Sequence, residues 1–299
     1  MALIPFDDRD GFIWFDGQLV PWRDAKIHVI THGLHYGSAI FEGERSYEGT
    51  IFKSKEHTSR LFNSANILGM SIPFSEDQIN AAKEETLKAN HLTDAYIRPV
   101  AWRGSEQMGI AAQETKTHVA IACWEWPSYF SPELREKGIS LKTSPWKKPA
   151  PDTAPCHAKA AGLYMINTLS KHMAEDAGFV DALMLDYRGY PVEATGANLF
   201  RIKDGVIRTP KPDCFLNGLT RQTVMSIAQD LGYPLEEDHI TLDDLHSADE
   251  VFITGTAAEV TAIGKIDDTI YSVGSVTRAL REAYENLVRG KPYRKTTAA

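Results

Sequence analysis

The pattern of hydrophobic and polar residues along the chain predicts hairpins and helices mixed together. Short apolar runs flank three pairs of an acidic residue and glycine, which are Asp16-Gly17, Glu48-Gly49 and Asp204-Gly205. Such a pair suits the positive φ of a tight turn, so each predicts a hairpin. Residues 181–194 predict one more hairpin. Strands rich in β-branched and aromatic residues are expected over 94–102, 118–126, 139–146 and 250–260.

Apolar residues three or four positions apart predict the helices. Ser54 is expected to cap a helix over 55–70, and the capping-box sequence Ser75–Gln78 is expected to start another that runs towards Asn90. Three later helices are expected over about 163–177, closed by Gly178, over 220–232 with Thr220 as N-cap, and over 275–290.

Residues 127–138 interrupt this pattern with two prolines, two serines and a polar tail. They predict a connection between two domains. The expected fold class is α+β, with a small N-terminal domain at 1–126, an interdomain loop at 127–138 and a larger C-terminal domain at 139–299. Hairpins mixed with helices argue against a parallel, doubly wound sheet.

The composition indicates an acidic, soluble protein. The 299 residues are 43% hydrophobic and 24% charged, with a formal net charge of −8. This charge, without lysine- or arginine-rich runs, argues against a nucleic-acid partner. No signal peptide is expected, because the N-terminus lacks a charged region followed by an apolar core. No membrane span is expected either, because no apolar run approaches about 18 residues. Three widely spaced cysteines without a C-x-x-C pair suit a reducing cytoplasm.

The stretch PCHAKAAGLYM places Lys159 among small residues. A lysine amine becomes a nucleophile when burial or a nearby cation lowers its pKa, and small neighbours leave room for another group beside it. An ordinary exposed lysine is the alternative. The histidines show no H-E-x-x-H sequence and no cysteines at ligand spacing, so no metal site is expected. His32 and His35 are expected to be structural.

Three more segments carry candidate binding groups. In LNGLTRQ, the amides of Leu219 and Thr220 at a helix start would suit a phosphate or an oxyanion. In TGTAAE, a small-residue turn after an apolar strand would expose backbone amides to a ligand. In VEATGANLF, Glu193 beside a small-residue run would pair with a cation. Taken singly, the three segments equally suit an ordinary helix cap, an ordinary turn and a solvated glutamate.

In their order and spacing these segments resemble the fold-type-IV family of pyridoxal-phosphate enzymes, and within it the branched-chain amino acid aminotransferases. The blocks that carry the resemblance span nearly the whole chain and are FIWFDGQLVPWRDAKIHV, THGLHYGSAIFEGERSY, AYIRPVAW, AKAAGLY, EATGANLF, NGLTRQ and DEVFITGTAAEV. The resemblance implies a two-domain α+β fold with mixed sheets, a barrel and flanking helices. It also implies pyridoxal 5'-phosphate as the cofactor.

The resemblance assigns cofactor roles to several residues. Lys159 would hold the cofactor covalently through its amine and would serve as acid and base for the proton transfer. Glu193 would keep the pyridine nitrogen protonated, and Tyr164 would form a hydrogen bond with the cofactor O3′. The phosphate would be bound by Arg60, Leu219, Thr220 and Thr256.

For the substrate pocket, the resemblance implies apolar walls and one placed cation. The walls would be Tyr36, Phe41, Trp126, Tyr129 and Tyr164. Tyr96 and Arg98 would form the polar element, with Arg98 at the γ-carboxylate of glutamate. The α-carboxylate would lie on Thr256, Ala257 and Ala258. A loop of a second subunit, carrying Ile110, would close the pocket, which implies a homodimer or a higher homo-oligomer.

Four positions depart from the family pattern. Ala197 stands where relatives often carry glutamate, Asn217 where many carry proline, and Trp102 and Arg103 where apolar residues are expected. Arg103 is therefore a second candidate for a carboxylate handle.

The expected activity is transfer of an amino group between leucine, isoleucine or valine and 2-oxoglutarate, which gives branched 2-oxo acids and L-glutamate. The alternatives on the same scaffold are a D-amino acid or (R)-amine transaminase and an aminodeoxychorismate lyase. A binding protein without catalysis is the remaining alternative, and the presence of both Lys159 and Glu193 argues against it.

Overall fold

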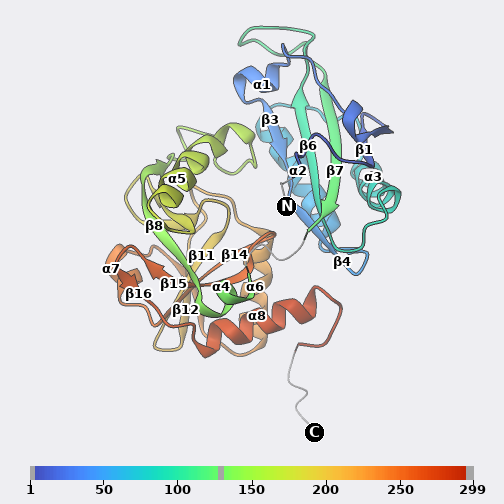
Figure 1. Ribbon diagram of the computed structural model, residues 1–299. Coiled ribbons are helices and arrows are strands. Elements are labelled where there is room, and N and C mark those ends of the chain that lie inside the picture. Colours follow the sequence, from blue (N-terminus) through green and yellow to red (C-terminus); the bar gives the residue numbers. More distant parts are fainter. Residues whose placement is uncertain (1–3, 127–130, 294–299) are drawn as a thin grey trace. The chain divides into compact units, whose positions relative to one another are not determined.

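The computed structural model describes residues 4–126 and 131–293. This part of the chain divides into two compact units (Figure 1). Unit 1 contains the described residues up to Trp126 together with Ala158–Leu163, and unit 2 contains the rest. Lys159 thus belongs to unit 1, although the chain on both sides of its short segment belongs to unit 2. The domain limits expected from the sequence stay a prediction.

Unit 1 is built on an antiparallel sheet. Its strands are β1 (Phe12–Phe15), β2 (Gln18–Pro21), β3 (Ala39–Phe41), β4 (Glu44–Tyr47), β5 (Thr50–Ile51), β6 (Ala95–Arg103) and β7 (Thr117–Glu125). Their order is β2-β1-β7-β6-β4-β5, and β3 pairs with β6 beside this path. The pairing of β6 with β7 runs from Ala95 opposite Glu125 to Arg103 opposite Thr117, which confirms the two long strands expected here.

Two helices, α2 (Ser54–Ile67) and α3 (Glu76–Ala89), cover one face of this sheet (Figure 1). Their residues Leu61 and Ile79 share one buried core with Ile97 and Ile121 of the central strands. Burial of each such side chain stabilises the fold by roughly 1.5–3 kcal/mol. The opposite face carries the short helix α1 (His32–Tyr36), which contacts β6, and a 3-10 turn at Trp22–Asp24 follows β2.

The hairpin turns have the backbone that their sequences predicted. Asp16-Gly17, Glu48-Gly49 and Asp204-Gly205 all have positive φ at both residues, between 46° and 101°. Glycine adopts this region without strain and aspartate tolerates it better than most residues. The three hairpins are therefore confirmed.

Of the two helix starts expected in unit 1, one is confirmed and one is wrong. Ser75 and Gln78 form the full capping box, in which Ser75 Oγ accepts from the Gln78 N–H and the Gln78 side chain accepts from the Ser75 N–H. Ser54 is not an N-cap, because α2 already begins there, after Lys53 in the left-handed region. The Ser54 hydroxyl instead donates to Asn80 of α3.

Unit 2 contains a closed barrel. Its strands are β8 (Ile139–Lys148), β9 (Asp181–Asp186), β10 (Pro191–Ala194), β11 (Asn198–Lys203), β12 (Val206–Pro210), β13 (Leu235–Asp238), β14 (Glu250–Gly255), β15 (Glu259–Ile266) and β16 (Thr269–Ile270). Six of them close the ring β8-β9-β10-β11-β14-β15, because β10 pairs with β11 and β15 pairs with β8. The barrel and its flanking helices confirm the α+β class.

Helices of unit 2 pack against the barrel strands (Figure 1). They are α4 (Pro132–Lys137), α5 (Met165–Asp176), α6 (Leu219–Asp230), α7 (Leu242–His246) and α8 (Ser275–Leu287). α5 contacts β8 and β9, while α6 and α8 contact each other and β14. The final helix buries Leu280 and Ala283 of its apolar stripe. None of the helices in the described ranges has both the length and the apolar character that a bilayer span requires.

Three helix limits in unit 2 differ from the sequence prediction. Thr220 as N-cap was wrong, because α6 begins at Leu219 after the N-cap Gly218 and Thr220 is buried in the first turn. The helix expected from residue 163 begins at Met165, after a 3-10 turn at Ala161–Tyr164. Part of the expected interdomain loop is the helix α4, which starts where the Ser131 hydroxyl accepts a hydrogen bond from the helix backbone.

Candidate active site

Backbone contacts fix the segment around Lys159 within unit 1. Ala160 forms an isolated antiparallel bridge with β3. The Phe41 N–H donates to the Lys159 carbonyl at 3.1 Å, and the Lys159 N–H donates to Ser64 Oγ of α2 at 3.0 Å. Ala158 and Ala160 are buried. The small residues beside Lys159 therefore let this segment pack closely against β3 and α2.

One aromatic ring of unit 1 lies beside two cations. Lys159 Nζ is 4.8 Å from the centre of the Phe41 ring, and the guanidinium carbon of Arg98 is 4.7 Å from the same centre. Arg98 Nη2 also donates to the Tyr96 hydroxyl at 3.1 Å, and the Tyr96 and Trp126 ring centres are 5.0 Å apart. Phe41, Arg98, Tyr96 and Trp126 thus form one chain of contacts that begins at Lys159.

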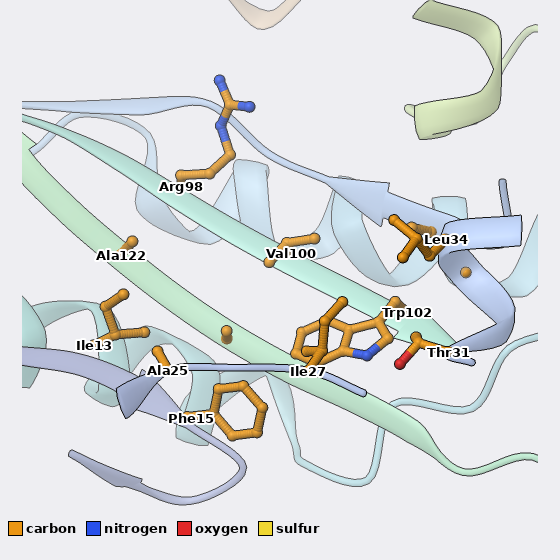
Figure 2. Close-up of a pocket in the computed structure, with 13 residues that line it drawn as sticks. Ile13, Phe15, Ala25, Ile27, Thr31, Leu34, Arg98, Val100, Trp102 and Ala122 are labelled. Atoms are coloured by element: carbon orange, nitrogen blue, oxygen red, sulfur yellow. The ribbon is translucent and has the colours of Figure 1, made fainter. Parts of the chain in front are cut away.

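An apolar groove of about 400 Å³ lies on the sheet face opposite α2 and α3 (Figure 2). Arg98, Val100 and Trp102 line it from alternate positions of β6. Figure 2 shows Arg98 towards one end of the groove, and Trp102 near Leu34 at the other. Of the predicted substrate residues in the described part of the chain, Arg98 alone lines this groove.

Tyr36 and Ile110 lie on exposed segments of unit 1 that one histidine joins. His32 Nε2 donates to the Gly109 carbonyl at 2.9 Å, and Ile110 follows as a side chain that is 89% exposed. The His32 ring centre lies 4.6 Å from that of Tyr36. His32 therefore fastens the Ile110 loop to α1. His35 likewise bonds the Val29 carbonyl, and a structural role for both histidines stays a prediction.

A buried carboxylate holds Arg60. Arg60 Nε donates to Glu42 Oε1 and Arg60 Nη2 donates to Glu42 Oε2, both at 2.7 Å. His57 Nδ1 lies 2.7 Å from the same Oε2. Burial alone would raise the pKa of Glu42, but the charges and hydrogen bonds of Arg60 and His57 outweigh it and hold that pKa well below its ordinary value. Glu42 is therefore ionised at neutral pH and fixes the Arg60 guanidinium.

Arg103, the second candidate for binding a substrate carboxylate, binds backbone carbonyls instead. Its Nη2 donates to the carbonyls of Leu68 and Gly69 at 2.9 and 2.8 Å, and its Nη1 donates to that of Ala112 at 3.2 Å. Leu68 and Gly69 follow the last turn of α2, where a cation stabilises a helix end. Arg103 therefore joins α2 to the loop between β6 and β7, which argues against a role in substrate binding.

In unit 2, Glu193 is a buried carboxylate with two polar neighbours. Its Oε1 lies 2.9 Å from Lys148 Nζ, and its Oε2 lies 3.5 Å from Asn198 Nδ2. Both side chains of the ion pair are only 10% exposed. Burial alone would lower the pKa of Lys148, but the charge of Glu193 outweighs it and raises that pKa above its ordinary value. Glu193 and Lys148 therefore form a buried ion pair.

The first turn of α6 presents backbone donors. A helix leaves its first N–H groups without intrahelical acceptors, and here these include Leu219 and Thr220. Asn198 shapes the approach to this turn, because it accepts from the Gly218 N–H at 3.2 Å and donates to the Leu216 carbonyl at 3.1 Å. A side chain at Gly218 would bring its Cβ into collision with Asn198 Oδ1. This geometry suits an anion at the helix N-terminus.

The other predicted residues of unit 2 lie on turns. Tyr164 is half-buried at the junction of the 3-10 turn with α5. Thr256, Ala257 and Ala258 form the turn between β14 and β15, all half-buried. Tyr129, one of the predicted substrate walls, lies outside the described residues.

Comparison with known proteins establishes the family. Residues 39–266 match the family described as amino-transferase class IV. The chain belongs to this family. It is 46% identical to the branched-chain-amino-acid aminotransferase of Pseudomonas aeruginosa, over 95% of either chain.

Solved structures of related enzymes have the same fold as this class IV aminotransferase. A crystal structure of the T.th. branched-chain amino acid aminotransferase with pyridoxamine 5'-phosphate aligns with a TM-score of 0.92 at 41% identity, covering 95% of this chain and 96% of that one. The same enzyme complexed with N-(5'-phosphopyridoxyl)-L-glutamate aligns with a TM-score of 0.91 at 40% identity and the same coverage.

Sequence reasoning missed three buried residues of this class IV aminotransferase that contact predicted site residues. They are Glu42 at Arg60, Lys148 at Glu193, and Asn198 between Glu193 and the start of α6. For Glu42 and Lys148, the sequence signal that could have found them is a charged residue at the end of an apolar strand, as in AIFEG and SPWKK. That signal does not name a partner, because the partners lie 18 and 45 positions away.

Proposed function

We propose that this class IV aminotransferase transfers amino groups between leucine, isoleucine or valine and 2-oxoglutarate, with pyridoxal 5'-phosphate as cofactor. The products are branched 2-oxo acids and L-glutamate. The observation that carries the proposal is the Phe41 ring, which lies beside both the Lys159 amine and the Arg98 guanidinium. An amine, an apolar ring and a cation in that order suit substrates whose side chain is either aliphatic or ends in a carboxylate.

The names of the relatives support the same reaction. The Pseudomonas aeruginosa relative is named a branched-chain-amino-acid aminotransferase, and the T.th. enzyme was crystallised with a phosphopyridoxyl adduct of L-glutamate. Both are similar to this chain over nearly its whole length. A D-amino acid or (R)-amine specificity has no comparable support.

The donor set fits pyridoxal phosphate. The Glu193 carboxylate, held by Lys148, suits a protonated ring nitrogen, and the first turn of α6 suits a phosphate. When bound, the cofactor supplies an electron sink for the substrate carbon that loses its proton. Lys159 would hold the cofactor covalently until the substrate amine displaces it, and the freed lysine amine would then accept and return that proton. Tyr164 bonds O3′, and the phosphate is bound by Arg60, Leu219, Thr220 and Thr256.

On the substrate side, Arg98 and Tyr96 receive the γ-carboxylate of glutamate. The Arg98–Tyr96 hydrogen bond and the stacking on Phe41 limit the orientations of the guanidinium. Apolar walls come from Tyr36, Phe41, Trp126, Tyr129 and Tyr164. The turn amides at Thr256, Ala257 and Ala258 hold the α-carboxylate.

The active form is a homodimer or a higher homo-oligomer. Several large apolar side chains of unit 1 are exposed, namely Ile27, Val29, Leu34, Met108 and Ile110. Exposed apolar surface of this kind marks an interaction site. In the assembly, the Ile110 loop closes the substrate pocket of the partner subunit. The compartment is the cytoplasm, where the three free cysteines would stay reduced.

One assay tests the reaction and a second tests the lysine. Purified protein is given a panel of L- and D-amino acids with 2-oxoglutarate, and glutamate formation is measured; the branched L-amino acids should be preferred. Lys159→Ala should abolish turnover while the fold is kept. Borohydride reduction of the wild type should leave a pyridoxyl group on the peptide that contains Lys159. A label on Lys147, Lys148 or Lys171 instead would refute the assignment.

A further inference from the structure

Glu42 is a buried acid that the proposed reaction does not use. It has no exposed surface and follows Phe41 at the end of β3. Its own N–H donates to the Pro99 carbonyl of β6 at 2.8 Å, so the backbone that carries the carboxylate is part of the sheet. Both carboxylate oxygens face cationic or donor groups of α2, which are Arg60 and His57. Burying such a charge is costly unless it is fully paired, so a carboxylate at this position calls for an explanation.

We propose that Glu42 is a positioning residue for the cofactor phosphate, which acts by fixing the Arg60 guanidinium. The inference rests on the proposed function, in which Arg60 binds the phosphate. Two parallel hydrogen bonds from Arg60 Nε and Nη2 use one edge of the guanidinium and set its plane. Arg60 Nη1 takes no part in these two hydrogen bonds. His57 holds the same carboxylate from a third side at 2.7 Å, so the carboxylate cannot rotate away without losing that contact as well.

Two opposed effects of Glu42 on phosphate binding have to be weighed. Its negative charge repels a phosphate, which weakens binding. The two hydrogen bonds from Arg60 to Glu42 restrict the rotation of the long Arg60 side chain. Without them, that rotational entropy would be lost when the phosphate binds. Both carboxylate oxygens of Glu42 already accept hydrogen bonds from the Arg60 guanidinium, which reduces the repulsion of the phosphate. Orientation is therefore the larger effect, and removing these two hydrogen bonds should loosen the cofactor.

The experiment measures how fast pyridoxal phosphate leaves the purified holoenzyme. In Glu42→Gln, one amide oxygen replaces two carboxylate oxygens and the amide nitrogen faces a donor, so the pair of hydrogen bonds from Arg60 is lost. Release should be roughly tenfold to a hundredfold faster, as expected for the loss of a charge-assisted contact. Glu42→Asp keeps the charge and shortens the side chain by one methylene, so it should also release faster than the wild type. A wild-type rate in Glu42→Asp would mean that charge rather than orientation matters and would overturn the proposal.

Glu44→Gln is the matched control. Glu44 is an equally buried carboxylate two residues along, but it pairs with Lys83 of α3 at 2.9 Å rather than with Arg60. Glu44→Gln should lower the thermal stability of the protein and leave cofactor release unchanged. An equal acceleration of release in Glu44→Gln and Glu42→Gln would overturn the proposal, since loosening of unit 1 in general would then explain both.

A double-mutant cycle with Arg60→Ala separates this inference from the proposed function. If Glu42 acts through Arg60, Arg60→Ala alone should speed release, and adding Glu42→Gln to it should speed release no further. An additional acceleration in the double variant would overturn the inference and leave Arg60 as a phosphate ligand. If Arg60→Ala releases the cofactor at the wild-type rate, both the inference and the role of Arg60 fail. A wild type that binds no pyridoxal phosphate at all would contradict the proposed function itself.

Discussion

At the scale of single residues, Arg98 is proposed to distinguish the two substrates of the reaction. Within the described residues its Nε is buried without a hydrogen-bond partner, which an incoming carboxylate would supply. Arg98→Ala should weaken kcat/KM for the glutamate and 2-oxoglutarate half-reaction by roughly tenfold to a hundredfold, because a charge-assisted hydrogen bond contributes about 1.5–3 kcal/mol. Leucine has no second carboxylate, so its half-reaction should change much less. The change in cofactor absorbance measures each half-reaction separately.

Arg103→Ala is the control for this prediction. Its guanidinium binds the carbonyls of Leu68, Gly69 and Ala112, so the substitution should lower stability and leave the preference between glutamate and leucine unchanged. Equal losses on both substrates in Arg98→Ala would mean that Arg98 is structural or binds the α-carboxylate. A selective loss in Arg103→Ala alone would move the role to Arg103.

The residues that sequence analysis could name are those whose chemistry is local to a motif. Lys159 among alanines and Glu193 before a small-residue run stand out from their neighbours. Lys148 does not, since Lys147 precedes it and only the folded barrel makes it the partner of Glu193. In β8 adjacent side chains point to opposite faces, so which of two neighbouring lysines is buried depends on register. Long-range ion pairs of this kind follow from tertiary structure.

At the scale of elements, His118 fastens three parts of unit 1 together. From β7, its Nδ1 lies 2.5 Å from Asp16 Oδ2 in the β1–β2 turn, and its Nε2 lies 3.3 Å from Glu106 Oε1 in the loop after β6. Burial alone would lower the pKa of His118, but hydrogen bonds and charges of Asp16 and Glu106 outweigh it and raise that pKa above its ordinary value. Stability should therefore depend on pH through this residue.

The direction of that dependence follows from proton linkage. A raised pKa in the folded state means a contribution that is fully present below the unfolded pKa of about 6.5 and is lost as the pH rises through the folded pKa. His118→Gln should lower the free energy of unfolding by up to roughly 1 kcal/mol at about pH 6 and by less at about pH 9. Urea unfolding of both proteins at both pH values measures the difference. His172→Gln, which removes an exposed histidine of α5, is the matched control for the loss of an imidazole ring. An effect of His118→Gln that is the same at both pH values would contradict the linkage.

Turns were predictable because two residues decide them, whereas helix starts depend on what precedes them. Asp16-Gly17 and Asp204-Gly205 adopt positive φ by local preference. Ser54 and Thr220 have the side chains of N-caps, but a left-handed Lys53 and an extended Gly218 start their helices one or two residues earlier than those caps require. Closure of the barrel was expected only through the family resemblance, since no local pattern reveals that β10 pairs with β11 and β15 with β8.

At the scale of the whole molecule, unit 1 carries apolar side chains that are exposed to solvent in the single chain. Leu34 is 63% exposed and lines the groove beside Trp102, and Ile27 lines the same groove. The nearby Ile110 loop is fastened to α1 by His32, so it is held in a defined position although its side chain is exposed. A loop that is fixed and apolar at its tip is suited to contact a partner, and binding then costs little conformational entropy.

Leu34→Asp should therefore weaken the proposed homodimer. An aspartate would place a charge within surface that becomes buried on association, which is costly without a pairing cation. Sedimentation velocity should show a shift towards monomer at micromolar protein concentration, with an unchanged circular dichroism spectrum because Leu34 contributes little to the core of its own chain. Turnover should fall together with the dimer fraction, because we propose that the Ile110 loop of one subunit completes the substrate pocket of the other. Ile270→Asp, at an 80% exposed position of β16 in unit 2, should leave both the assembly and the turnover unchanged. A Leu34→Asp protein that stays dimeric would place the interface elsewhere, and a fully active monomer would show that the Ile110 loop does not complete the substrate pocket of a second subunit.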